Sequence, residues 1–190
     1  GVEAFNKKII AASPTVYDMA AYPKTLSGKT VTAYVNTHTD LSDELYREGK
    51  LVSDNYKNIL RSQTNAAAIP AEVTVRYGVT VRRANLRNLP TGEGLFFYAS
   101  DRNFDALQET ALDPGEAVAI LHTSTNGYFY YVQAYNYRGW LSKFDVAETD
   151  RSTWLRYAEP KNFLTVVAKD YTLKADGAQV LFQQGARLQL

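Results

Sequence analysis

The chain has 190 residues, of which 45% are hydrophobic and 22% are charged, and this balance excludes a disordered protein. Lys and Arg number 21 against 20 Asp and Glu, so the net charge of +1 gives no electrostatic reason to expect nucleic acid as a partner. Cysteine is absent, which excludes disulfides, zinc–thiolate sites and thiol catalysis within these residues. No apolar run approaches the length of a membrane span, and no signal-sequence pattern is present.

The first region, residues 1–71, is predicted to be mixed and partly helical. Ser13 followed by Pro14 is typical of a helix start, with Ser as the cap and Pro at the first helical position. Residues 29–35 alternate small or β-branched apolar residues with Thr and Tyr, which predicts a half-buried strand.

Two short helices are expected after this strand. Ser42 is predicted to cap the first, which has acidic residues in its first turn and ends at Gly49. Ser53 is predicted to begin the second. One face of that second helix would carry Tyr56, Ile59 and Leu60.

The second region, residues 72–159, is predicted to be a small β-barrel. Residues 117–121 and 128–134 are rich in β-formers, and Asn126-Gly127 between them is a strong hairpin signal. A second tight turn is expected at Arg138-Gly139, and Trp140 after it is predicted to be largely buried in the barrel. Short strands with turn residues at close intervals are typical of such barrels.

The third region, residues 160–190, is predicted to contain three strands, at 163–168, 171–173 and 180–182. About 30 residues rarely bury enough surface to close a barrel of their own. This piece is therefore expected to be incomplete or to pack on its neighbour.

The order and spacing of the motifs from Arg83 to Trp140 resemble the bacterial SH3-like (SH3b) domain that precedes the catalytic domain in NlpC/p60-type cell-wall cysteine peptidases. The resemblance implies a mainly β fold with a helical N-terminal segment (α+β), in which residues 1–71 are clip-like and residues 160–190 begin a second SH3-like domain. The residues that carry it are Arg83, Leu86-Arg87, Leu89-Pro90-Thr91, Phe104-Asp105, Leu107-Gln108, Thr110, Gly115-Glu116, Leu121-His122, Ser124 and Gly139-Trp140.

The resemblance implies a function as well as a fold. Peptidases of this family cut peptidoglycan stem peptides between γ-D-glutamate and a diamino acid, and their nucleophile is a cysteine that this chain does not have. The chain is therefore expected to be a non-catalytic region that binds stem peptides and shapes the active site of a downstream catalytic domain. The implied location is exported, in the periplasm or at the cell wall, with no cofactor. The alternative is a stand-alone SH3-like interaction module that binds a protein or a glycan.

Candidate catalytic and metal-binding residues are few. His122 ends a predicted strand, and a structural role is expected for it. His38 lies two residues before Asp40, but two ligands on a turn make a weak metal site, and capping explains their polarity more simply. No nucleophile elbow or phosphate-binding loop is present. The acids worth inspecting for hydrolysis are Glu93, Asp101 and Asp105, for which a solvated loop is the favoured interpretation.

The first candidate binding cluster combines basic residues with a long aromatic loop. Arg83 and Arg87 could bind a carboxylate bidentately, or they could pair with Asp101 or Asp105 and hold the loop in place. The loop from Gly92 to Asp105 is long for a small barrel and is predicted to face the catalytic domain. Its candidate contact residues are Phe97, Tyr98, Ser100 and Asp101.

The second candidate cluster is the aromatic run from Tyr128 to Tyr137. Side chains alternate between the two faces of a strand, so one face of this run must fill the barrel. The opposite face, with Tyr131 and Tyr135, is expected to lie under a neighbouring domain or to bind a ligand.

Overall fold

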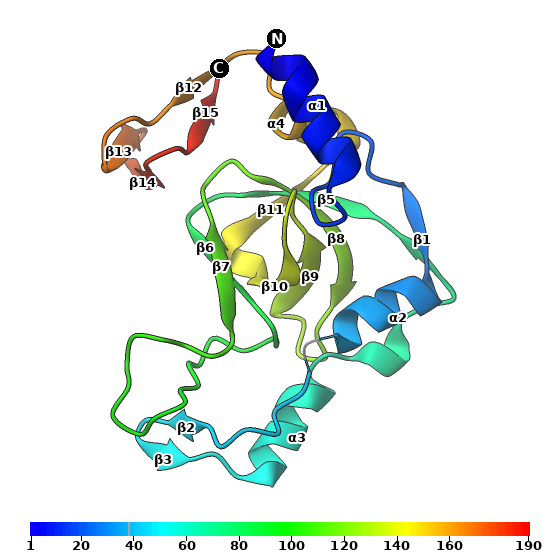
Figure 1. The fold of residues 1–190 in the computed structure, drawn as a ribbon, viewed down its shortest axis with the longest axis vertical. Coiled ribbons are helices and arrows are strands. Elements are labelled where there is room, and N and C mark those ends of the chain that lie inside the picture. Colours follow the sequence, from blue (N-terminus) through cyan, green and yellow to red (C-terminus); the bar gives the residue numbers. More distant parts are fainter. Residues whose placement is uncertain (38) are drawn as a thin grey trace.

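The computed structural model describes residues 1–37 and 39–190, and its centre is a seven-stranded antiparallel sheet curved into a small barrel (Figure 1). The predicted class, mainly β with a helical N-terminal segment, is confirmed. In spatial order the strands are β11 (Val146–Thr149), β5 (Arg76–Thr80), β8 (Ala117–Thr123), β9 (Phe129–Gln133), β10 (Arg138–Ser142), β6 (Ala84–Arg87) and β7 (Gln108–Leu112).

Both faces of the central strands are buried, which explains the near-continuous apolar sequence of β8. Val118 and Ile120 point into the barrel, where they pack with Val132 of β9 and Leu141 of β10. Residues at alternate positions lie on the outer face. That outer face carries Ala117, Ala119, Leu121, Tyr131 and Trp140. The period of two expected for strands is therefore kept, with an apolar layer on each side.

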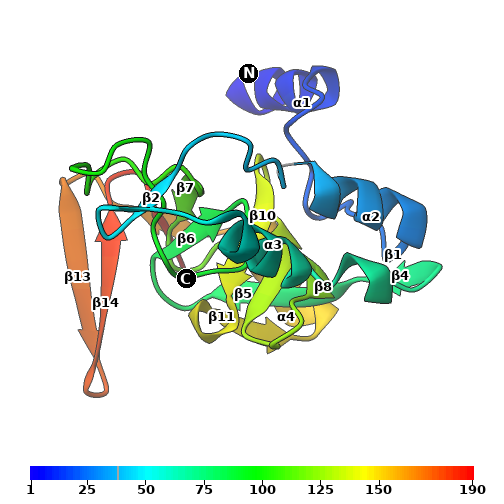
Figure 2. The ribbon, with the colours of Figure 1, turned by 90° about the horizontal axis from the view of Figure 1, so that it is seen from below.

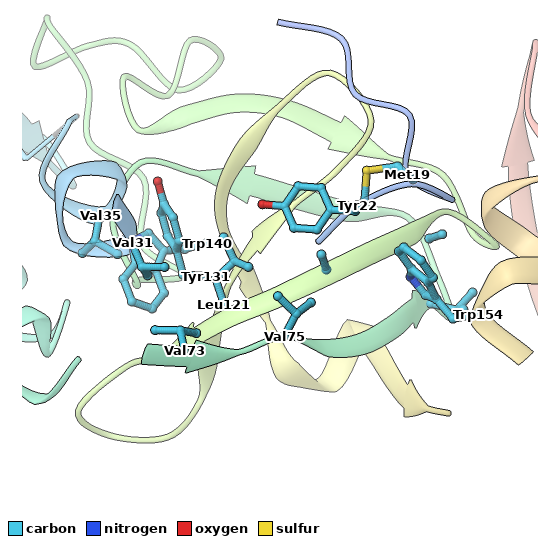
Figure 3. Close-up of a cluster of buried hydrophobic side chains, with 13 residues drawn as sticks. Met19, Tyr22, Val31, Val35, Val73, Val75, Leu121, Tyr131, Trp140 and Trp154 are labelled. Carbon is cyan, nitrogen blue, oxygen red and sulfur yellow. The ribbon is translucent and has the colours of Figure 1, made fainter. Parts of the chain in front are cut away.

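The outer face of the barrel is covered by the N-terminal segment (Figure 3). Val31 and Val35 of helix α2 (Gly28–Asn36) pack beside Tyr131 and Trp140, and the Tyr131 hydroxyl donates a 2.7 Å hydrogen bond to the Tyr34 carbonyl. Trp140 is completely buried, as predicted. Its indole lies on the outer face of β10 under α2, however, and not in the barrel interior.

Helix α2 replaces the strand predicted for residues 29–35, so that prediction is wrong. Alternation places Val31 and Val35 on one side of a strand, but their spacing of four also places them on one face of a helix. The Ser27 side chain accepts a hydrogen bond from the Thr30 amide at 3.1 Å and caps the helix. Gly28 lies so close to the Pro70 carbonyl that a Cβ atom would overlap it.

Two further N-terminal predictions are wrong. Ser13 ends helix α1 (Val2–Ala12) instead of starting a helix, and its backbone is extended, the conformation that a following proline favours. The helix predicted at Ser42 is absent. A hairpin of β2 (Tyr46–Arg47) and β3 (Lys50–Leu51) follows, and it turns at Glu48 and Gly49, which have positive φ.

The helix predicted from Ser53 is confirmed as α3 (Asp54–Ser62). The Ser53 hydroxyl accepts a 3.2 Å hydrogen bond from the Tyr56 amide. Leu60 is buried, whereas Ile59 is exposed, so these two residues do not share a buried face. A short 3-10 turn, η1 (Ala66–Ala68), leads on to β4 (Glu72–Thr74), which pairs with β1 (Thr25–Ser27).

The C-terminal part begins after a second 3-10 turn, η2 (Lys143–Asp145), strand β11 and helix α4 (Arg151–Ala158). The Trp154 indole of α4 is buried against the barrel and donates a 3.0 Å hydrogen bond to the Val118 carbonyl. The last residues form β12 (Phe163–Thr165), β13 (Asp170–Ala175), β14 (Ala178–Gln183) and β15 (Arg187–Gln189). Strands are present at the three predicted places, although the first ends at Thr165 instead of residue 168, and β15 is a fourth strand that the pattern did not predict. The β13–β14 hairpin extends to one side of the barrel (Figures 1 and 2).

Candidate interaction site

The connection between β6 and β7, residues 88–107, consists of a folded base and an exposed tip. We call residues 88–96 and 105–107 the loop base, and residues 97–104 the loop tip. Apolar side chains of the base form a buried cluster with residues that come before the barrel in the sequence. The members of this cluster are Leu41, Leu45, Val52, Leu60, Leu89, Leu95 and Leu107. The loop base and the β2–α3 region therefore share one core.

Polar contacts reinforce this attachment. Phe96 and Tyr46 exchange two backbone hydrogen bonds, with N–O distances of 2.9 and 2.7 Å, so the base adds a bridge to the β2 strand. The Glu93 carboxylate pairs with Arg47 at 3.1 Å and accepts a hydrogen bond from the Tyr56 hydroxyl. These contacts fix the position of the loop relative to α3.

Arg87 lies at the centre of the loop base and is almost completely buried. Its Nη1 donates to Asp105 Oδ2 at 2.6 Å, and its Nη2 donates to the Glu93 carbonyl at 2.6 Å. The other Asp105 oxygen accepts from the amides of Leu95 and Leu107, at 3.1 and 3.0 Å. Of the two alternatives left open by the sequence, the contacts of Arg87 correspond to the one in which it holds the loop in place.

Arg83 lies elsewhere. Its Nη1 pairs with Asp113 at 2.8 Å, not with Asp101 or Asp105, and its side chain is partly exposed. The predicted grouping of Arg83 with Arg87 under the loop is therefore wrong. Residues 84–87 form an extended strand, which rises about 3.3 Å per residue. Position 83 therefore lies roughly 13 Å from position 87 along the chain.

The loop tip exposes its aromatic side chains. Phe97, Tyr98 and Phe104 are 49%, 71% and 78% exposed, and Ser100 is also exposed. Asp101 is half-buried, and its carboxylate accepts hydrogen bonds from the amides of Asn103 and Phe104 at 2.8 and 3.3 Å. These backbone donors lower the pKa of Asp101, so it is ionised at neutral pH and shapes the turn.

The two candidate tyrosines of the aromatic run differ in their surroundings. Tyr131 is buried between β9 and α2, and burial raises the pKa of its hydroxyl. It makes an internal packing contact, and only 4% of its surface is exposed. Tyr135 is 50% exposed and lines a cavity on another side of the barrel. The run therefore does not form one continuous aromatic surface.

The candidate catalytic and metal-binding residues that the structure describes have structural partners. His122 Nε2 lies 3.0 Å from the Asn65 carbonyl, and burial lowers the pKa of this imidazole. His38 lies outside the described residues. Glu93 and Asp105 have the loop-base partners given above. Among residues 1–37 and 39–190, no group of three or more His, Asp or Glu side chains could hold a metal ion.

Comparison with known proteins identifies the barrel. Residues 95–142 match the family described as SH3 domain (SH3b1 type). The chain is also similar to the solved structure of a novel NlpC/P60 endopeptidase from Photobacterium damselae subsp. piscicida, with 20% sequence identity and a TM-score of 0.67. The similarity covers 86% of this chain and 37% of that chain, so the present chain spans little more than a third of that protein. No curated protein sequence matches the chain.

These findings confirm the predicted resemblance at the level of fold. Residues 95–142 match an SH3 domain of the SH3b1 type, and the fold of the chain is similar to that of a region of an NlpC/P60 endopeptidase. The chain has no cysteine and therefore no cysteine nucleophile. No helix within the described residues is long and apolar enough to cross a membrane.

Sequence reasoning missed the group of residues that ties the loop base to the β2–α3 region. Arg47, Tyr56 and Glu93 come from segments up to 46 residues apart, and nothing in their local patterns marks them as a group. The one available signal is the run of leucines in both segments, which now proves to be a shared core.

Proposed function

We propose that this chain is the non-catalytic, wall-binding and active-site-shaping region of an exported γ-D-glutamyl-diamino acid endopeptidase of the NlpC/p60 type. A catalytic domain with the cysteine nucleophile would follow it in the parent protein. Residues 1–71, 72–159 and 160–190 would serve as the clip-like segment, the first SH3-like domain and the start of a second. The expected partners are peptidoglycan stem peptides and that catalytic domain.

The observation that carries the proposal is the exposed aromatic tip on an anchored base. Phe97, Tyr98 and Phe104 leave apolar area of one eight-residue segment in water, and exposed apolar patches often mark a contact surface. The Arg87–Asp105 pair and the leucine core hold the base, so contact with a partner requires little further ordering of the chain. A presented and preorganised surface is what a domain needs if it is to line the cleft of a neighbour.

The wall-binding part can be tested with the chain itself. We expect it to sediment with purified peptidoglycan sacculi, and we expect the Phe97→Ala/Tyr98→Ala variant to be retained less. The matched control is Tyr128→Ala/Phe144→Ala, which removes another exposed aromatic pair, 53% and 62% exposed and far along the sequence from the loop. Lack of retention of the unmodified chain, together with a tight protein partner, would support the stand-alone interaction module instead.

The active-site-shaping part requires the parent protein. We expect the same loop variant in the full-length endopeptidase to change the relative rates on free stem peptides and on intact wall, because the tip would line the entry to the cleft. The control pair Tyr128→Ala/Phe144→Ala should leave both rates unchanged. If the loop variant cuts each of the two substrates at the same rate as the unmodified enzyme, the tip has no role in substrate access.

A further inference from the structure

A cavity of about 410 Å³ lies where the barrel, α4 and the C-terminal strands meet. Its walls come from the turn between β7 and β8, from the end of α4 and from β15. The cavity shares no residue with the loop base or the loop tip. Its volume is at the small end of the range for ligand pockets and suits a group the size of one amino acid.

One hydrogen-bond acceptor in the wall lacks a full set of partners. The Glu116 carboxylate is half-buried, and one of its oxygens accepts a 3.3 Å hydrogen bond from the Asp113 amide. A carboxylate can accept several hydrogen bonds, so Glu116 has room to accept from a ligand that donates them.

The charge and shape of the wall favour a cationic donor. Burial raises the pKa of Glu116, because the carboxylate loses part of its hydration there, and a cation beside it would stabilise the charged form. The charge of Asp113 also raises this pKa, and Arg187 and Arg83 lower it. Arg83 is paired with Asp113, and the Arg187 guanidinium lies 5.1 Å from the centre of the Phe163 ring. The aromatic rings of Tyr135 and Tyr157 complete the wall, and such rings attract ammonium groups through their faces.

We propose that this cavity binds the primary ammonium group of an amino-acid-sized ligand, with Glu116 as counter-ion and Tyr135 as an aromatic wall. An ammonium carries a positive charge and three hydrogen-bond donors, so it can pair with the Glu116 carboxylate. The aliphatic part of the ligand lies against Tyr135 and Tyr157. A carboxylate on the same ligand can pair with Arg187, which also lines the cavity. This inference does not rest on the proposed wall-binding function.

The test is a calorimetric or NMR titration of the 190-residue chain with Nα-acetyl-lysine and with Nα-acetyl-norleucine. The two probes share an amide, a carboxylate and an alkyl arm, and only the first carries an ammonium. We expect binding of the lysine derivative and at least tenfold weaker binding of the norleucine derivative, since a charge-assisted hydrogen bond contributes about one order of magnitude in affinity. A third probe, acetyl-Gly-Lys-Gly-amide, has no carboxylate and shows whether a lysine within a peptide chain is also bound.

Variants locate the binding. Glu116→Gln keeps the shape of the side chain and should weaken binding of Nα-acetyl-lysine about tenfold or more. Tyr135→Ala, at a half-exposed position, should also weaken it without unfolding the chain. The controls are Glu72→Gln and Tyr171→Ala, an exposed carboxylate and an exposed tyrosine outside the cavity, which should bind as the unmodified chain does.

Three results would overturn the proposal. They are equal affinity for the lysine and norleucine derivatives, no binding of Nα-acetyl-lysine at millimolar concentration, and unchanged affinity in folded Glu116→Gln. Circular dichroism of each variant establishes that it is folded. Loss of sedimentation with sacculi in the Phe97→Ala/Tyr98→Ala variant would not bear on this cavity, so the two proposals fail separately.

Discussion

Aromatic side chains lie on the outside of the barrel in two regions, and the regions differ in what covers them. On the outer face of β9 and β10, Tyr131 and Trp140 are buried beneath α2. On the loop tip, Phe97 and Tyr98 have no such cover and remain about half or more exposed. The same residue types thus complete the core in one region and form an open surface in the other.

The difference shows how a small barrel obtains both stability and a contact surface. The barrel interior alone is a small core, and the α2 layer adds a second one on the opposite face of the same strands. The loop tip adds no core of its own, because only the loop base packs against the N-terminal segment. Substitutions on the covered face should therefore lower stability. Substitutions in the loop tip should instead reduce binding, with little effect on stability.

The largest expected effect is on the covered face. Trp140→Ala should lower the free energy of unfolding by roughly 3–5 kcal/mol, because it removes one of the two fully buried Trp side chains and leaves a cavity between β10 and α2. Thermal or denaturant unfolding of the purified chain measures it. An unchanged midpoint would mean that α2 does not cover this face in solution.

Trp140→Phe is the matched control for that prediction. The Trp140 indole N–H is buried without a hydrogen-bond partner, so its removal breaks no hydrogen bond. The loss of stability should therefore be clearly smaller than for Trp140→Ala.

A smaller but still large effect is expected at the loop base. Arg87→Ala should cost about 3 kcal/mol, because it leaves the Asp105 carboxylate buried without its counter-ion. Arg83→Ala removes an exposed pair with Asp113 and should cost at most about 1 kcal/mol. Chemical denaturation of both variants gives the comparison, and equal costs would contradict the anchoring role assigned to Arg87.

The barrel could be predicted from sequence because its signals are local. Asn126-Gly127 forms the predicted turn between β8 and β9, and Gly127 has the positive φ that such a turn requires. The alternating faces of β9 also follow from the sequence, with Val132 inside and Tyr131 outside. A second apolar face on the same strand indicated that something covers it.

The N-terminal segment could not be predicted to the same extent, because its structure depends on its neighbours. The pattern of residues 29–35 fits a helix as well as a strand, and the cap at Ser27 together with packing on Trp140 decides between them. The partners of Glu93 and Arg87 in the loop base are also non-local. The exposed tip, by contrast, follows from a loop that is longer than the barrel requires.

A weaker effect concerns the junction between the N-terminal segment and the barrel. Burial lowers the pKa of His122 below its usual value of 6.5, so the unfolded chain binds the proton more readily than the folded chain. Stability should therefore fall as the pH drops through and below 6.5. The pH dependence of unfolding between pH 7 and pH 5 should be shallower in His122→Gln, which keeps every other titrating group. Parallel curves for the two proteins would show that His122 does not titrate differently on folding.

The smallest effect on stability is expected where the proposed effect on binding is greatest. Phe97→Ala/Tyr98→Ala removes two exposed side chains that contribute nothing to the leucine core of the loop base, so the free energy of unfolding should change by no more than about 0.5 kcal/mol. Denaturant unfolding beside the Trp140 variants measures this. A loss of more than about 1 kcal/mol would mean that the tip is part of the folded core, since surface substitutions rarely reach that cost. Any loss of sacculus retention in this variant could then no longer be read as the loss of a contact surface alone.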